Sequence, residues 1–271
     1  MNDDTYDVHA IRYGRVDRTA AENFLGPCAW DGPMPMDYFV WVVANRQRTV
    51  VVDTGFGPDQ ARLRGRTITR PVPDGLRAVG VDPSQVDDVV LTHLHYDHAG
   101  NLGLFDRATF HVQEREVHFA VGPAMTDPGR SSAYVPDDLA ALVHLVHGRR
   151  VHFCGPDEEL FPGISVHLVG GHTAGTQVVR VRTAGGPLLL ASDAAHFYAN
   201  MQQRRVFAVT HDPEQLLDAY ARRLPGLVDS PEDIVPGHDP LVLHHYPPAE
   251  PHLDGWVAQL SAGFRMRSDE R

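Results

Sequence analysis

The sequence predicts an α/β protein, and two observations support this. Apolar runs of strand length recur along the chain and alternate with stretches of helical pattern. The two halves of the chain also echo each other. TVVVDTG and LLLASDA both run from apolar residues to an aspartate, Asp53 and Asp193, and VVLTHLH and DIVPGHD both lead to histidines. We interpret this echo as two related halves of βαβ type. The length of 271 residues is enough for a well-buried core.

In the first half, each apolar run is bounded by turn residues or polar residues. Residues 37–44 and 48–55 read as adjacent strands joined by a short turn at 45–47. A short buried strand is expected at 86–92 and another at 108–112, and the second is followed by a helical stretch at 113–121.

In the second half, strands are expected at 163–169, 176–183 and 186–193, with a hairpin turn at 184–187. A helix is expected over 211–224, where Asp212 is a suitable N-cap, Pro213 suits the first turn and Gln215 completes a capping-box pattern. The apolar run within 232–239 closes the set.

The stretch 122–150 interrupts this strand pattern. It is rich in Gly, Pro and Ser at first and then becomes helical in PDDLAALVHLVHGRR. It is either a lid over a site or an ordinary surface connection, since long inserts are often functional without having to be. We therefore expect a single domain over 1–271 with a candidate lid insert at 122–150.

Composition excludes several classes of protein. The formal net charge is −11, from 35 acidic and 24 basic residues, which argues against a nucleic-acid-binding surface. The chain has no lysine, so lysine-based chemistry is excluded. Cys28 and Cys154 lie far apart without paired spacing, which disfavours a disulfide framework or a metal–thiolate site. The N-terminus lacks the apolar core of a signal peptide, and the longest apolar run, 38–44, is far shorter than the roughly 20 residues of a membrane span. A cytoplasmic protein is the default expectation.

The segment VVLTHLHYDHAGN (89–101) carries the strongest functional signal. His93, His95, Asp97 and His98 fall within six positions at the end of a strand-like run. A loop that leaves a strand can turn such side chains toward one point. Neutral imidazoles and carboxylates suit Zn²⁺, and also Fe²⁺, Mn²⁺ or Co²⁺.

Three later residues stand at similar strand-to-loop junctions. His172 lies in GGHTAGTQ, Asp193 in LLLASDA and His238 in IVPGHDP. Each alone is weak evidence for a metal site, but together with the 93–98 segment they are strong evidence. Other histidines are expected to be exposed or hydrogen-bonded in the core: His9, His111, His144, His147, His152, His167, His244, His245 and His252.

These seven residues resemble the full metal set of the metallo-β-lactamase superfamily, and VVVDTGFG resembles its early strand-loop motif. The resemblance spans 37 to about 240 and implies an αββα four-layer sandwich with a dinuclear metal site at its edge. By this resemblance, His93, His95 and His172 hold one ion, Asp97, His98 and His238 hold the other, and Asp193 bridges them. The resemblance also places Asp53 beside the ligands, where it would orient them; a turn residue at a strand end is the alternative.

Within that superfamily, the chain most resembles the N-acyl-homoserine lactonases, through HLHYDHAG, PGISVHLVGGHTAGTQ, SDAA and PGHD. His95 stands where redox di-iron members carry glutamate, which disfavours oxygen or nitric oxide reduction. Only 33 residues follow His238, which disfavours a glyoxalase II-type thioesterase. One position departs from the lactonase pattern. Those enzymes carry a tyrosine three residues after the bridging aspartate, and this chain has His196.

The resemblance implies a quorum-quenching type of hydrolase, in which a hydroxide bridging two divalent ions, Zn²⁺ by preference, opens a lactone ring. The substrate would be an N-acyl-homoserine lactone or a related small lactone. His196 would bind the developing oxyanion, or act only as a polar residue of the pocket rim, and Asp97 or Asp193 would transfer the proton. Candidate residues of the acyl pocket are Met34, Met36, Tyr38, Phe39, Phe119, Phe197 and Met201, although ordinary core packing explains each of them equally well.

A thioesterase or another ester hydrolase is the alternative enzyme, and a metal-holding binding protein is the alternative outside enzymes. No nucleic-acid or membrane partner is expected, and a homodimer is left open.

Overall fold

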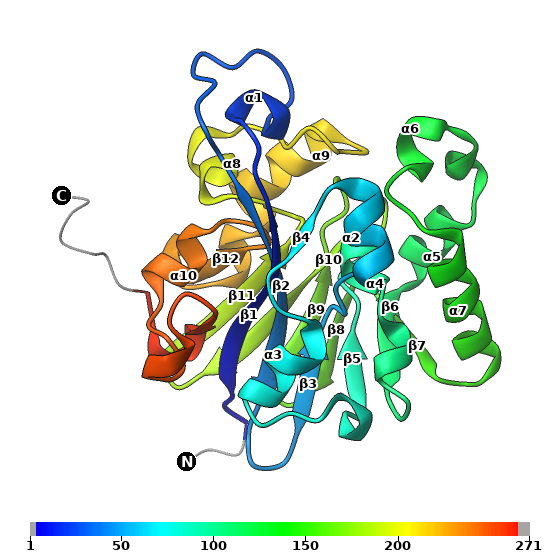
Figure 1. Cartoon of the computed structure of the whole chain (residues 1–271), viewed down its shortest axis with the longest axis vertical. Coiled ribbons are helices and arrows are strands. Elements are labelled where there is room, and N and C mark those ends of the chain that lie inside the picture. Colours follow the sequence, from blue (N-terminus) through cyan, green and yellow to red (C-terminus); the bar gives the residue numbers. More distant parts are fainter. Residues whose placement is uncertain (1–3, 265–271) are drawn as a thin grey trace.

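The structure is a computed structural model that describes residues 4–264, and two β-sheets pack face to face at its centre (Figure 1). The larger sheet runs in the order β13 (Val257–Gln259), β1 (Asp7–Val16), β2 (Met36–Ala44), β3 (Thr49–Val52), β5 (Asp88–Val90), β6 (Thr109–Gln113) and β7 (Val151–Cys154), and β4 (Thr67–Ile68) also pairs with β1. The smaller sheet runs in the order β12 (Ile234–Pro236), β11 (Gly186–Ser192), β10 (Gln177–Thr183), β9 (Ile164–Leu168) and β8 (Asp157–Phe161).

Helices cover the outer face of each sheet. On the larger sheet lie α2 (Pro58–Arg64), α3 (Val72–Ala78), α5 (Glu114–Ala120) and α7 (Pro136–His147), and buried residues of these helices share one core cluster with the strands. On the smaller sheet lies α9 (Pro213–Asp218), whose Leu216 packs beside Val178 and Leu189. The expected αββα sandwich is therefore confirmed.

Strand β2 shows how the sequence produces this layering. Successive side chains of a strand point to opposite faces. Tyr38 and Val40 accordingly join the outer cluster, while Phe39 and Trp41 join the cluster between the sheets. A strand buried on both faces reads as a continuous apolar run, and each large side chain contributes about 1.5–3 kcal/mol through its burial.

Several expected elements are present with shifted ends, and others were not expected. The helix expected over 211–224 is α9 followed by a π-helical turn at Ala219–Arg223, and the Asp212 carboxylate accepts a hydrogen bond from the Gln215 backbone at 3.0 Å. The side chain of Gln215 lies against Gly170 rather than completing a capping box. Strand β1 was missed. Its polar residues and its irregular register between Arg12 and Gly14 obscure the alternation.

The insert 122–150 contains α6 (Pro128–Ser131) and α7. Leu142 of α7 is buried in the core of the larger sheet, so the second half of the insert is anchored there. The first half lies beside the site described below. That the insert acts as a lid stays a prediction. In the described part of the chain, no helix combines the length and apolar character of a bilayer span.

Candidate metal centre and adjoining pocket

The seven candidate ligands come from loops that follow strands of both sheets. His93 and His95 follow β5, and the short helix α4 (Tyr96–Ala99) carries Asp97 and His98. From the smaller sheet, His172 follows β9, Asp193 follows β11 and His238 follows β12. Because β5 is parallel to its neighbours and β11 is parallel to β12, their carboxyl ends meet at one edge of the sandwich. The structure therefore brings all seven residues together at that edge.

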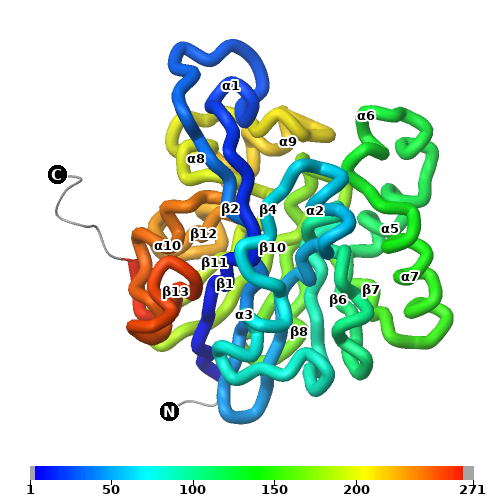
Figure 2. The backbone as a smooth tube through the Cα atoms, viewed as in Figure 1, coloured from blue at the N-terminus to red at the C-terminus, as the bar shows by residue number. Residues whose placement is uncertain are grey.

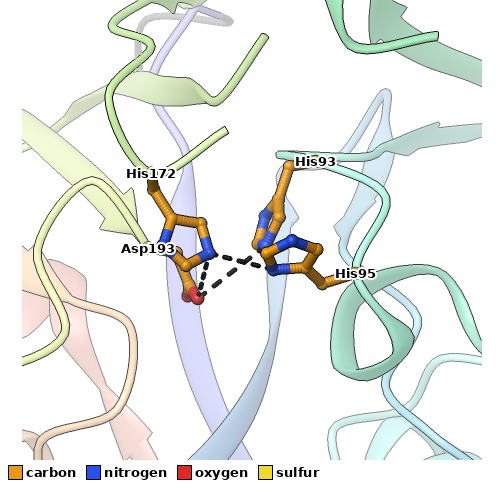
Figure 3. A group of neighbouring side chains, drawn as sticks. All are labelled: His93, His95, His172 and Asp193. Atoms are coloured by element: carbon orange, nitrogen blue, oxygen red, sulfur yellow. Dashed lines mark hydrogen bonds and ion pairs between the residues drawn. The ribbon is translucent and has the colours of Figure 1, made fainter. Parts of the chain in front are cut away.

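One oxygen of the Asp193 carboxylate faces a first group of imidazoles (Figure 3). Its Oδ2 lies 3.2 Å from His172 Nε2 and 3.8 Å from His93 Nε2. His95 joins them, because its Nδ1 lies 3.0 Å from His172 Nε2. The ligand atoms of these four residues all lie within 4.8 Å of one another.

The other oxygen faces a second group. Asp193 Oδ1 lies 2.9 Å from His238 Nε2 and 3.2 Å from His98 Nε2. The Oδ2 atom of Asp97 lies 3.8 and 3.7 Å from these same two nitrogens. The Nδ1 of His238 lies 2.8 Å from the backbone carbonyl of Asp37, which fixes the ring orientation. The two oxygens of one carboxylate thus divide the ligands into two sets.

The chemistry of these donors fits divalent cations. Several buried atoms that face the centre lack a hydrogen-bond partner, namely Nε2 of His93, His98 and His238 and Oδ1 of Asp193. Burial lowers the pKa of His93, His95 and His172, so these imidazoles are neutral and can act as ligands. Burial alone would raise the pKa of Asp193, but the surrounding imidazoles lower it well below its usual value. The role of the seven residues as ligands remains our proposal.

Asp53 is buried behind the second set of ligands. Its Oδ2 lies 2.7 Å from His98 Nδ1, and its Oδ1 accepts hydrogen bonds from the backbone and the hydroxyl of Thr92. Carboxylates placed in this way orient a ligating imidazole and raise its basicity. The backbone of Asp53 has φ of 61°, a left-handed conformation that aspartate tolerates better than most residues. This geometry supports the proposed orienting role over that of a simple turn residue.

Glu116 joins the two ligand-bearing loops, which the sequence did not indicate. Its fully buried carboxylate accepts hydrogen bonds from the Leu94 backbone at 3.0 Å, the Thr173 hydroxyl at 2.5 Å and the Gly175 backbone at 3.2 Å. The hydroxyl of Tyr134 donates a fourth hydrogen bond at 3.0 Å, and the ring of Tyr134 packs edge-on against His95. One side chain of α5 therefore fixes the 93–98 loop, the 172–176 loop and the insert relative to one another.

Two glycines allow the backbone to approach closely at the centre. A Cβ atom on Gly175 would lie 2.1 Å from the Glu116 backbone nitrogen, and one on Gly237 would lie 2.7 Å from the Ser192 backbone. These contacts explain glycine in AGTQ and in PGHD.

A cavity of about 560 Å³ opens onto the centre. Of the predicted pocket residues, Met36, Tyr38 and Phe119 line it. The other four are not among the residues that line it: Phe39 lies between the sheets, Met201 packs against two core clusters, and Met34 and Phe197 lie in a cluster with Phe207. Tyr38 and Phe39 are adjacent in a strand and could not both face the pocket.

Part of the remaining wall comes from the insert 122–150, which the sequence singled out, and the rest comes from connections that it did not. Figure 2 shows the blue 17–35 connection beside the yellow segment after α8 (Tyr198–Gln203), and the backbone of Leu25 donates to Val206 at 2.9 Å. These segments contribute Arg18 and Phe207 to the cavity, and the insert contributes Tyr134. Arg64, Arg66 and Arg130 also line it.

His196 is buried against Asp193, and it also lines the cavity. Its Nε2 lies 3.0 Å from Asp193 Oδ2, and its ring stacks on Phe207 with centroids 3.6 Å apart. The ring is therefore buried rather than exposed, and whether it binds the oxyanion or only contributes a polar group to the pocket stays a prediction. Its nearest polar partner is the central carboxylate.

Of the nine other histidines that were expected to be exposed or hydrogen-bonded in the core, His111 and His152 are both hydrogen-bonded. His111 Nε2 lies 2.9 Å from Asp88 Oδ1, and His152 Nε2 lies 2.7 Å from Glu158 Oε1. Donor atoms of both imidazoles and of Cys154 lie within 4.8 Å of one another, a thiol beside two histidines that the spacing did not suggest.

Comparison with known proteins agrees with this architecture. The family model of the metallo-beta-lactamase superfamily matches residues 35–250. The N-acyl homoserine lactonase AiiB of Agrobacterium fabrum is 33% identical over 191 residues, which cover 64% of this chain and 68% of that protein. An N-acyl homoserine lactonase of Bacillus sp is 28% identical over 224 residues, or 75% of this chain and 82% of that protein.

The fold also matches solved structures. The crystal structure of a quorum-quenching N-acyl homoserine lactone lactonase superposes with a TM-score of 0.72 at 23% identity, covering 88% of this chain and 94% of that one. At this level of identity the match supports the fold alone.

Proposed function

The chain belongs to the metallo-β-lactamase superfamily and is a metal-dependent hydrolase, and from this premise we propose that it opens the ring of small lactones. One observation carries the proposal: the two oxygens of Asp193 divide the surrounding donors into two sets beside the cavity. The sequence similarity to N-acyl homoserine lactonases supports a lactone over other substrates. Zn²⁺ is the proposed metal, since imidazole and carboxylate donors suit it.

Two divalent ions in such a centre supply Lewis acidity and a water molecule that is deprotonated at neutral pH. The residues of the chain supply the remaining functions. Asp193 and the histidines hold the centre, while Asp97, which lines the cavity, is placed to accept a proton and return it to the leaving alkoxide. Tyr134 and the stacked pair of His196 and Phe207 also line the cavity, so the reacting group of the substrate would lie beside them.

The experiment is a substrate panel on metal-replete protein. N-Acyl-homoserine lactones, simple γ- and δ-lactones, acyl thioesters and an aryl ester are compared by kcat/KM, with and without a chelator. We expect the lactones to have the highest kcat/KM of the panel and the chelator to abolish turnover. If the thioesters have the highest kcat/KM, the alternative thioesterase function replaces the lactonase. If no compound of the panel is hydrolysed while metal is bound, the site serves only for binding.

His196 offers a sharper test, because there the chain departs from the lactonase pattern. We propose that it acts as a positioning residue whose Nε2–H holds the Asp193 carboxylate. His196→Ala should lower kcat on the best lactone about tenfold, since the Asp193 carboxylate would no longer be held in its orientation. It should also weaken metal affinity by roughly tenfold, the lower end of the loss that follows when the hydrogen-bond partner of a metal ligand is removed. Kinetics and metal titration on the same samples measure both.

His196→Gln is the matched control, because it keeps a donor near the same place and should restore part of both losses. Lowered kcat with unchanged metal affinity would instead assign His196 to the oxyanion. Unchanged kcat in the alanine variant would rule out both roles.

A further inference from the structure

The cavity wall contains three arginines that the proposed chemistry does not use. Arg18, Arg64 and Arg66 line it and are each partly buried. Among the ion pairs of residues 4–264, none joins these three guanidinium groups to a carboxylate. Arg130, the fourth arginine of the wall, differs because it is paired with Asp127 at 3.5 Å.

Two of the three are fixed by a residue within the metal-binding segment. The Tyr96 hydroxyl accepts a hydrogen bond from Arg66 Nε at 3.2 Å, and its ring lies 4.0 Å below the Arg64 guanidinium. Arg66 Nη1 also donates to the Arg64 carbonyl at 2.8 Å. Since Tyr96 stands between His95 and Asp97, both cations are held next to the centre, and Arg66 retains donors that these bonds do not use.

Arg18 comes from a different segment, the 17–35 connection. Its Nη2 donates to the Glu22 carbonyl at 2.9 Å, its Nη1 lies 3.4 Å from Met36 Sδ, and its guanidinium lies 5.6 Å from the centre of the Phe207 ring. Burial lowers the pKa of Arg18, the charge of Arg66 acts in the same direction, and the charge of Glu22 opposes both, so Arg18 and Arg66 repel each other across the cavity.

This arrangement is unfavourable without a ligand. Like charges that are partly withdrawn from water repel, and no carboxylate of the wall forms an ion pair with these three guanidinium groups, although, against the opposing effect of burial, the charge of Asp97 helps to raise the pKa of Arg66. Asp127 is already paired, and Asp97 and Asp193 face the proposed cations. The charge of the two proposed divalent ions would largely be offset by these two carboxylates, by Asp53 and by the deprotonated water described above, so the three arginines leave the cavity positive in a chain whose net charge is −11. Such a cavity attracts and orients anions.

We infer that the substrate carries an anionic group, a carboxylate or a phosphate, that Arg18 and Arg66 bind while the neighbouring ester or lactone is hydrolysed. The inference rests on the proposed hydrolysis and narrows its substrate class. The planar guanidinium fork matches either anion, and Arg64 adds to the positive field. A neutral acyl-homoserine lactone leaves these cations without a partner.

The test uses matched pairs of lactones. N-Succinyl-, N-glutaryl- and N-adipoyl-homoserine lactone are compared with the butanoyl, pentanoyl and hexanoyl compounds, which have equal carbon numbers but a neutral chain end. A phosphorylated acyl chain forms a second arm that separates the two anions. At low ionic strength we expect kcat/KM to be at least tenfold higher for the anionic member of one pair, and the preference to shrink as salt is added.

Arg66→Gln and Arg18→Gln should each lower kcat/KM for that anionic lactone on the order of tenfold to a hundredfold, the effect of one charge-assisted hydrogen bond. The neutral partner should change by less than about threefold. Arg62→Gln is the control, because Arg62 lies on the same helix as Arg64 but is exposed and paired with Asp59.

Different outcomes would contradict the anion preference and the lactonase function. Equal or better turnover of every neutral lactone overturns the anion preference and leaves the lactonase intact. If no lactone is opened, the lactonase fails, and calorimetric titration with the lactam analogues of the same pairs still measures the preference. Equal affinity for the anionic and neutral lactams then overturns the inference.

Discussion

Asp193→Ala is expected to abolish turnover, lowering kcat/KM on the order of 10³-fold or more. Loss of an outer partner of a metal ligand costs roughly 10–100-fold, and Asp193 is the one residue that faces both proposed sets of ligands. Removing its carboxylate also leaves the charge of two cations less compensated. Elemental analysis should therefore find about two ions per chain in the parent and fewer than one in the variant.

Two further variants make this test specific. Asp193→Asn keeps the shape and one carbonyl oxygen, so it should retain about one ion while losing most activity. Asp106→Ala removes an exposed carboxylate and should change neither quantity. Full metal content and activity in Asp193→Ala would show that Asp193 is not the bridge.

Glu116→Ala is expected to cost about 3–5 kcal/mol of unfolding free energy, because each buried donor left unsatisfied costs about 1–3 kcal/mol. The hydroxyls of Thr173 and Tyr134 can rotate to other partners, but the backbone N–H groups of Leu94 and Gly175 cannot. Denaturant unfolding of metal-free protein measures the effect without a contribution from metal binding.

Glu114→Ala is the matched control, since Glu114 lies on the same helix with its side chain 66% exposed. It should stay within about 0.5 kcal/mol of the parent. An equal loss in both variants would reduce Glu116 to a generic helix residue. Metal affinity should fall only in Glu116→Ala, because its partners lie in the two loops that carry His93 and His172.

The central strands and the seven candidate ligands could be predicted from the sequence because both leave local patterns in it. Buried strands need continuous apolar runs, and side chains that act together at strand ends are chemically conspicuous. Strand β1 was missed because its polar residues His9, Arg12 and Arg15 recur at every third position instead of every second, and its register is irregular.

The partners of the centre could not be predicted in the same way. Glu116 and Glu114 occupy the same helical stretch, and only the tertiary structure determines that one is buried and the other exposed. The cavity arginines likewise depend on which connections meet, as in the approach of the 17–35 segment to the segment after α8. Tyr96 reads as a spacer between two ligands, yet its ring and hydroxyl hold two guanidinium groups.

The division between strand-end ligands and cavity walls has an evolutionary consequence. The candidate ligands are fixed by strands of both sheets, whereas much of the wall comes from connections at 17–35, 122–134 and 204–211. Mutations, and even insertions, in those connections can alter which molecules enter while the strands that hold the centre stay intact. Lineages that share this scaffold can therefore diversify in substrate by changing the walls separately from the reaction centre, and His196, which contacts both, is where such a change would be most constrained.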